Sequence, residues 1–280
     1  MKTPLVSKDW LTDNIDDPQL VILDASMKNN VAGRSPEFPD ISIRGARYFD
    51  LKGKFSDVNS SLPNTLPAPS VFEKAARELG INRDSKIVVY DNLGIYSAPR
   101  VWWMFNAMGH DQVAVLDGGL SAWKKAGLPV EETEHQAYPH GDFTASFDKE
   151  KLKNAEQVLE NIKRKDFVTI DARSEGRFSG ATPEPRKESR SGHVPGSVNL
   201  PYTSVLNDNF YKPETELRKI FISVNPQNKP MTFTCGSGLT ACIILLAAEL
   251  AGTDHKSVYD GSWTEWGSLK NFPVATDTAK

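Results

Sequence analysis

Residues 21–25 read Val-Ile-Leu-Asp-Ala, and residues 168–172 read Val-Thr-Ile-Asp-Ala. Further along, Val115-Leu116-Asp117-Gly118-Gly119 returns as Val258-Tyr259-Asp260-Gly261-Ser262. Four such pairs follow one another in the same order, with spacings between 143 and 151 residues. A period this long indicates a duplicated domain and not a solenoid of small repeats.

Short apolar runs bounded by polar, Gly or Pro residues recur in both halves of the chain. Runs of this length rich in Val and Ile are typical of buried parallel strands, and they lie at 20–24, 86–90, 113–116, 167–171, 230–234 and 257–259. Helices are expected between them at 70–79, 97–108 and 240–251. Strands that alternate with helices predict an α/β fold, in which each half is a parallel sheet with helices on both faces.

The chain has 280 residues, which is enough for two domains of ordinary size. The stretch from residue 132 to 141 is polar, contains Pro139 and shows no periodicity, as is typical of a connection. We therefore predict a first domain at residues 1–135, a linker at 136–150 and a second domain at 151–280.

The composition is that of a soluble globular protein, with 39% hydrophobic and 25% charged residues. Thirty-three basic and 36 acidic residues give a net charge of −3, so there is no overall positive field to attract nucleic acid or an anionic membrane. No apolar run approaches the ~20 residues of a transmembrane helix, and no signal-peptide core follows residues 1–10. These features predict a cytoplasmic protein with no nucleic-acid or membrane partner.

Only two cysteines are present, Cys235 and Cys242, which are too few for a disulfide scaffold or a cysteine-rich metal site. On a mostly helical segment they would be about 10 Å apart along the axis, whereas a disulfide needs Cα atoms within about 7 Å. We expect two free thiols. Cys242 stands among Ala, Ile and Leu residues and is expected to pack in the core, which leaves Cys235 to be explained.

Cys235 directly follows a predicted strand, at the place where Asp91 follows the corresponding strand of the first half. Ligands of open α/β sheets bind beyond the carboxyl ends of the strands. Gly236 and Gly238 can adopt backbone angles closed to other residues, so that successive N–H groups turn inward as an anion-binding nest. A helix that begins near Thr240 adds unpaired N–H groups and the positive end of its dipole.

A cysteine that faces such donors is expected to be a thiolate near neutral pH and to act as a nucleophile. The hydroxyls of Ser237 and Thr240 can supply further donors. The alternative is an ordinary Gly-Ser-Gly turn beside a small buried cysteine. The exchange of aspartate for cysteine in one half only favours the catalytic interpretation.

The chain resembles the two-domain rhodanese-like sulfurtransferases over roughly residues 5–272. The resemblance is carried by Cys235-Gly236-Ser237-Gly238-Leu239-Thr240-Ala241, by Ser97-Ala98-Pro99-Arg100-Val101-Trp102-Trp103, by Gly192-His193-Val194-Pro195-Gly196 and by Tyr259-Asp260-Gly261-Ser262-Trp263. Members of this family have an inactive N-terminal copy and a catalytic C-terminal copy, which fits the difference between Asp91 and Cys235. The cysteine loop is similar to that of members that use 3-mercaptopyruvate, because thiosulfate-preferring members carry Arg and Lys at the positions of Gly236 and Ser237.

The resemblance implies a sulfur relay with no metal and no organic cofactor. Cys235 would take the sulfur of 3-mercaptopyruvate as a persulfide, release pyruvate and pass the sulfur to cyanide or to a thiol such as thioredoxin. The loop residues Gly236, Ser237, Gly238, Leu239 and Thr240 would surround the sulfur. Arg177 and Arg186 would bind the carboxylate and carbonyl of the donor. From the residues alone, solvated arginines remain an alternative, because Arg173, Lys187 and Arg190 lie nearby in the sequence.

Three other functions can be weighed at this stage. A thiosulfate sulfurtransferase would use the same relay with another donor. A cysteine phosphatase with a Cys-x5-Arg loop would need arginine at position 241, which is Ala241. A non-enzymatic binding module would need no cysteine, and the first half shows that this fold exists without one.

The sequence departs from the family at one point. Members can place an acidic residue and a histidine from the N-terminal half near the active site, where this chain aligns Lys52 and Asn64. The first half also reads Ser42-Ile43-Arg44-Gly45 where His-Ile-Pro-Gly is usual. A serine–histidine–aspartate proton relay is therefore not carried over to this chain. His193 could replace it, but in Gly-His-Val-Pro-Gly a histidine more often fixes a turn.

Overall fold

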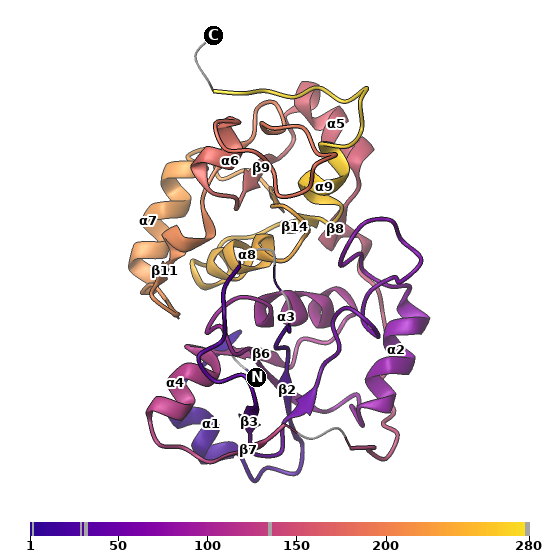
Figure 1. The fold of residues 1–280 in the computed structure, drawn as a ribbon, viewed down its shortest axis with the longest axis vertical. Coiled ribbons are helices and arrows are strands. Elements are labelled where there is room, and N and C mark those ends of the chain that lie inside the picture. The colour runs from indigo at the N-terminus through magenta and orange to yellow at the C-terminus, as the bar shows by residue number, and fades with distance from the viewer. Residues whose placement is uncertain (2, 29, 31–32, 134–135, 278–280) are drawn as a thin grey trace. The chain divides into compact units, whose positions relative to one another are not determined.

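The computed structural model describes residues 1, 3–28, 30, 33–133 and 136–277, which form two compact units (Figure 1). Unit 1 comprises Met1–Asn59, Leu66–Asp148 and Asp208–Tyr211. Unit 2 comprises Ser60–Thr65, Lys149–Asn207 and Lys212–Lys280. Each unit therefore includes one short segment from the other half of the sequence.

Unit 1 is built on a five-stranded parallel sheet in the order β1-β6-β5-β2-β4. These strands are β1 (Leu5–Val6), β2 (Leu20–Asp24), β4 (Arg47–Tyr48), β5 (Lys86–Tyr90) and β6 (Val113–Leu116). The helices are α1 (Lys8–Asn14), α2 (Pro69–Glu78), α3 (Ala98–Ala107) and α4 (Gly119–Lys125). Two further strands, β3 (Ile41–Ile43) and β7 (Val130–Glu132), pair antiparallel.

Unit 2 has its own five-stranded parallel sheet, in the order β10-β9-β13-β14-β8. Its strands are β8 (Leu152–Lys153), β9 (Val168–Asp171), β10 (Val198–Asn199), β13 (Met231–Thr234) and β14 (Lys256–Tyr259). The helices are α5 (Ala155–Arg164), α6 (Glu175–Ser179), α7 (Glu214–Val224), α8 (Thr240–Leu250) and α9 (Ser262–Trp266). Short 3-10 helices lie at Lys149–Lys151 and Tyr202–Val205, and β11 (Leu206–Asn207) pairs with β12 (Phe210–Tyr211).

The two sheets share one topology, which confirms the duplication and the predicted α/β fold. Taken in chain order, β1, β2, β4, β5 and β6 correspond to β8, β9, β10, β13 and β14, and each set has the same neighbours. Asp24 pairs with Tyr90 in unit 1, as Asp171 pairs with Thr234 in unit 2. Asp91 and Cys235, the next residues, therefore occupy equivalent positions.

The predicted elements differ from the observed ones mainly at their ends. The strand predicted at 230–234 begins at Met231, because Pro230 has no N–H to donate to the ladder. The helix predicted at 70–79 begins one residue earlier, at Pro69, since proline suits the first turn of a helix. Short elements such as α9 are too brief to give a periodic signal in the sequence.

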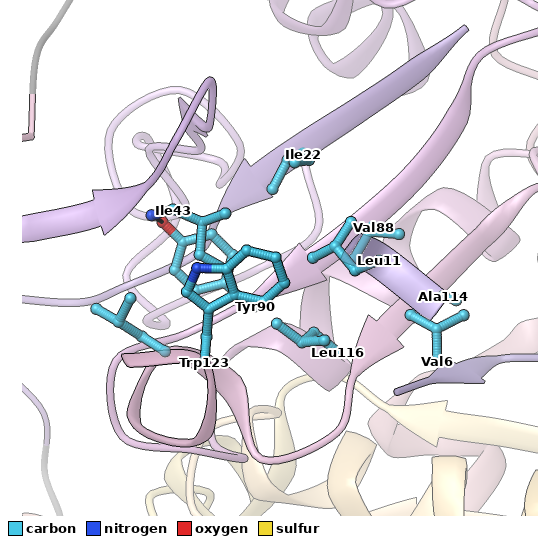
Figure 2. Close-up of a cluster of buried hydrophobic side chains, with 10 residues drawn as sticks. Val6, Leu11, Ile22, Ile43, Val88, Tyr90, Ala114, Leu116 and Trp123 are labelled. Atoms are coloured by element: carbon cyan, nitrogen blue, oxygen red, sulfur yellow. Dashed lines mark hydrogen bonds between the residues drawn. The ribbon is translucent and has the colours of Figure 1, made fainter. Parts of the chain in front are cut away.

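The core of unit 1 reaches the end of its central strand. Figure 2 shows a cluster of buried side chains in which Tyr90 lies beside Trp123 and Ile43. The buried phenol of Tyr90 accepts a hydrogen bond from the Ile43 backbone N–H at 3.0 Å. The last residue of β5 is therefore fixed by packing and by a hydrogen bond, directly before the loop that starts at Asp91.

Part of the segment predicted as a linker packs on unit 1. The Phe143 N–H donates to the Ile81 carbonyl and the Asp148 N–H to the Ala107 carbonyl. Phe143 is fully buried against the rings of Phe72 and Phe105. In the part of the chain that the structure describes, no helix combines the length and apolar character needed to span a bilayer.

Residues 208–211 comprise the turn after β11 and the strand β12. This segment packs on the loops of unit 1. A Cβ atom at Gly94 would overlap Asn209, and one at Gly118 would overlap Phe210, so both glycines allow a close approach. The Tyr211 N–H donates to the Asp117 carboxylate at 3.0 Å. Burial of that carboxylate, only partly offset by its backbone hydrogen bonds, raises the pKa of Asp117 to about 6.

Asp117→Asn should stabilise the protein at pH 7 and leave its stability near pH 4 almost unchanged. A folded-state pKa above the unfolded value favours the protonated form, so the wild type loses stability as the pH rises from about 4 through 6. Asparagine keeps the acceptor oxygen for Tyr211 and carries no charge. We expect a gain of about 1–3 kcal/mol at pH 7, measured by urea unfolding at both pH values. Asp13→Asn, at an exposed site, is the control, and equal stability of Asp117→Asn and wild type at pH 7 would contradict the prediction.

Candidate active site

Cys235 lies at the carboxyl end of β13, which is flanked by β9 and β14 in the sheet of unit 2. The residue is 2% exposed, and α8 begins five residues later at Thr240. Cys242 is fully buried within α8, and both cysteines are free thiols, as the sequence predicted. A cavity of about 410 Å³ in unit 2 is lined by Val168 and Thr169 at the start of β9. It therefore lies at the amino ends of the strands and not at the carboxyl end where Cys235 lies.

The carbonyl groups of the loop are bound by residues from α9 and its start. The Trp263 N–H donates to the Cys235 carbonyl, and the N–H and hydroxyl of Thr264 both donate to the Gly236 carbonyl. The Ser262 hydroxyl accepts the Cys235 N–H at 3.2 Å. The first two residues of the loop are therefore fixed through their backbone groups by α9 and the residue at its start.

The equivalent loop of unit 1 demonstrates what this backbone can bind. The Asp91 carboxylate accepts hydrogen bonds of 2.8–3.0 Å from four backbone N–H groups, and it is 1% exposed. The donors are Leu93, Tyr96, Ser97 and Ala98. By the strand register, Ser237, Thr240 and Ala241 occupy the positions of the first three. In unit 1 this loop is thus an anion-binding nest, filled by a carboxylate of the chain itself.

The two loop glycines serve different purposes. Gly238 has a φ of +79°, in the left-handed region, as the sequence predicted. Gly236 does not have a positive φ, so the expectation of an unusual backbone angle there was wrong. A Cβ atom on Gly236 would lie 3.1 Å from a terminal nitrogen of Arg177. Glycine at this position makes room for a guanidinium group beside the cysteine loop.

Arg177 is held at that position by a buried acid. Its guanidinium binds both oxygens of Glu184, at 3.1 and 2.5 Å, and Glu184 is 4% exposed. Glu184 also binds Arg173, which in turn pairs with Asp171 at the end of β9 and stacks on the ring of Trp263. Bidentate pairs of this kind fix both position and orientation. These ion pairs of alternating charge run from Asp171, at the end of β9, to Arg177, beside Gly236.

The neighbouring basic residues fall into separate groups. Arg173 is fully buried in the network just described, and Arg190 donates to the carbonyls of Trp266, Gly267, Leu269 and Phe272. Both therefore stabilise the fold. Arg186 is half-buried, and its guanidinium has no hydrogen bond or ion pair with any residue that the structure describes. A half-buried cation without a partner is suited to bind an anion.

His193 belongs to the turn, as its sequence context indicated. Its ring stacks on Phe178 with centroids 3.8 Å apart, and its Nδ1 is hydrogen-bonded to the Phe178 carbonyl at 2.9 Å. Its backbone pairs with Ala275. The ring is thus engaged in packing within unit 2.

Asn64 lies against the cysteine loop, at a position that the family resemblance aligns near the active site. It lies in the short segment that unit 2 takes from the first half of the chain, and its side chain donates to the carbonyl and hydroxyl oxygens of Ser237. The two residues are 173 positions apart. No local pattern could link them, although the position had been singled out by the family resemblance.

Comparison with known proteins supports the duplicated domain seen in the structure. The rhodanese-like domain family matches residues 7–126 and again residues 154–269. The 3-mercaptopyruvate sulfurtransferase of Escherichia coli (strain K12) is 39% identical over 279 residues, with 97% of this chain and 98% of the relative covered. The thiosulfate sulfurtransferase of Cricetulus griseus is 41% identical over 272 residues, with 94% and 91% covered.

A solved structure gives the same result. The crystal structure of SseA, a 3-mercaptopyruvate sulfotransferase from Escherichia coli, matches with a TM-score of 0.81 at 38% identity, and covers 94% of this chain and 99% of that one. Two matches to one domain family, and relatives near 40% identity over almost the whole length, leave no ambiguity of family. The chain belongs to the rhodanese-like sulfurtransferases and contains the rhodanese-like domain twice.

Proposed function

We propose that the chain moves sulfur from 3-mercaptopyruvate through a persulfide on Cys235 to a thiol or to cyanide, and releases pyruvate. The observation that carries the proposal is the equivalence of Cys235 to Asp91, whose carboxylate is bound by four backbone N–H groups. In the catalytic copy the negative group at this place would be the thiolate and then the terminal sulfur of the persulfide. Residues 151–280 would be this catalytic copy, residues 1–135 the inactive one and residues 136–150 the linker.

The transfer would occur in two displacements. The Cys235 thiolate attacks the sulfur of 3-mercaptopyruvate, an S–S bond forms and the C–S bond breaks, with its electron pair leaving on carbon as the enolate of pyruvate. The enolate then takes a proton to give pyruvate. An acceptor thiolate attacks the outer sulfur, and the Cys235 thiolate leaves, so that no external oxidant or reductant is consumed.

The charge around the loop supports a donor with one carboxylate. Gly236 and Ser237 are neutral, and Arg177 beside them is already paired with Glu184. Thiosulfate is a small dianion that would gain most from unpaired cations directly beside the sulfur. Mercaptopyruvate instead carries its carboxylate several bonds from its sulfur. There Arg186, which has no partner among the described residues, and Arg177 could bind the carboxylate and carbonyl.

Thiosulfate is the second candidate donor. The relay would be the same, and a relative at 41% identity is named for that substrate. The physiological acceptor would be a thiol such as thioredoxin, whose thiolate can attack the outer sulfur of the persulfide. We further propose a cytoplasmic location, since both cysteines are free thiols and the chemistry needs Cys235 reduced.

Cys235→Ser should abolish turnover with either donor, by at least about a thousandfold, because the nucleophile is lost. After incubation with 3-mercaptopyruvate alone, intact-mass spectrometry should show an adduct of about 32 Da, one sulfur atom, on the wild type only. Cys242→Ser is the matched control, because serine can keep the hydrogen bond that the Cys242 thiol makes to the Gly238 carbonyl. A wild-type preference for thiosulfate would keep the relay and overturn the donor assignment, and an adduct on Cys235→Ser would overturn the nucleophile.

Arg186→Gln should raise the KM for 3-mercaptopyruvate by about 10–100-fold, the range for one lost charged hydrogen bond, with a smaller change in kcat. Lys187→Gln, at the exposed neighbouring position, removes the same charge and should leave the KM within about twofold. Steady-state kinetics of the two variants provide the comparison. An equal rise of the KM in both variants would mean that Arg186 acts only through the overall positive charge of this surface and does not bind the donor directly.

A further inference from the structure

The segment that carries Asn64 is held in a defined turn. The Ser60 hydroxyl accepts the Leu62 N–H and is hydrogen-bonded to the Thr65 hydroxyl at 2.9 Å, and the Thr65 hydroxyl donates its hydrogen to the Leu62 carbonyl. Asn64 follows a proline and has a φ of 59°, in the left-handed region that asparagine tolerates better than most residues. Its side chain is therefore presented from a fixed backbone.

The side-chain amide of Asn64 contacts the cysteine loop at Ser237. Its Nδ2 lies 3.1 Å from the Ser237 carbonyl oxygen and 3.2 Å from the Ser237 hydroxyl oxygen, and both residues are more than nine-tenths buried. A carbonyl oxygen only accepts hydrogen bonds, so the end of the amide that faces it must be the NH₂ group. The orientation of the amide is thus fixed by the loop itself.

This orientation decides what the Ser237 hydroxyl can do. A hydroxyl has one hydrogen to donate and two lone pairs with which to accept. Asn64 occupies a lone pair, and an NH₂ group cannot take the hydroxyl hydrogen. The hydrogen of Ser237 must therefore point elsewhere, and Cys235 is only two residues away in the same loop.

We propose that Asn64 is a positioning residue of the sulfur-transfer site, which holds the Ser237 hydroxyl as a hydrogen-bond donor to the sulfur on Cys235. An amide neither gains nor loses a proton near neutral pH, so residue 64 cannot withdraw the proton of Ser237. The serine would then stabilise the thiolate and the persulfide as a fixed donor and would not act as a base. The inference rests on the proposed persulfide relay and specifies how this chain supports it.

Two substitutions of Asn64 separate the side chain from its backbone. Asn64→Gly keeps the left-handed backbone without strain and removes the amide. Asn64→Asp keeps the shape but replaces the donor by an acceptor, which would attract the Ser237 hydrogen away from the sulfur. Asn228→Gly is the matched control, because Asn228 is an exposed asparagine of unit 2 that also has a positive φ, 48°.

With the best sulfur donor, we expect Asn64→Gly to lower kcat about tenfold, the factor for one hydrogen bond of ~1.4 kcal/mol, and Asn64→Asp to lower it further. The KM should stay within about twofold, because Asn64 contacts the loop and not the donor. Adding Asn64→Gly to Ser237→Ala should cost less than about twofold more, since the two act through one hydrogen bond. Asn228→Gly should match the wild type.

A second readout keeps this test independent of the donor. Alkylation of Cys235 by iodoacetamide at pH 7.5, followed by mass spectrometry, should be several-fold slower in Asn64→Asp than in the wild type and unchanged in Asn228→Gly. Wild-type kcat and alkylation in Asn64→Asp would overturn the inference, as would equal losses in Asn64→Gly and Asn64→Asp that follow a lower melting temperature. A wild type without turnover or persulfide would instead overturn the proposed function, while the alkylation rates would still decide the part played by Asn64.

Discussion

The backbone N–H groups that follow the central strand of each sheet are the constraint on which the rest of the site depends. In unit 1 four of them converge on the Asp91 carboxylate. The sheet fixes where this loop begins, through the register of Asp24 with Tyr90 and of Asp171 with Thr234. Because the donors belong to the backbone, a loop of different sequence at the equivalent position can present the same groups, and we propose that Cys235 takes the place of Asp91 there.

Buried charges then fix how the arginines near the cysteine loop are held. Glu184 and Asp171 compensate the fully buried Arg173, whose isolated burial would be very costly. The same Glu184 orients Arg177 next to Gly236, where a Cβ atom would come within 3.1 Å of the guanidinium. The ion pairs that compensate the buried Arg173 thus also set the position of Arg177 beside the cysteine loop. Arg186, by contrast, has no partner among the described residues.

Each unit also depends on a short segment from the other half of the sequence. In unit 1 the segment at residues 208–211 lies against Gly94 and Gly118 and buries the Asp117 carboxylate. The Asp91 loop is therefore filled by its own carboxylate and is also contacted by this segment. In unit 2 the segment that contains Asn64 reaches Ser237, so that the cysteine loop is contacted by a residue from the first half of the sequence.

The sequence by itself determined the duplication, the parallel α/β sheets and the places of Cys235 after a strand and Cys242 inside a helix, because these depend on patterns along the chain: apolar runs, turn residues and the exchange of Asp91 for Cys235. The residues alone could not show that Arg173 and Arg190 are bound within the fold, since most of their partners lie in segments that only folding brings together. For the same reason the sequence suggested the wrong cause for the glycine at position 236. Its φ is not positive, and its lack of a side chain instead makes room for Arg177. Only the tertiary structure placed Asn64 on Ser237, because a hydrogen bond between residues 173 positions apart leaves no trace in local sequence.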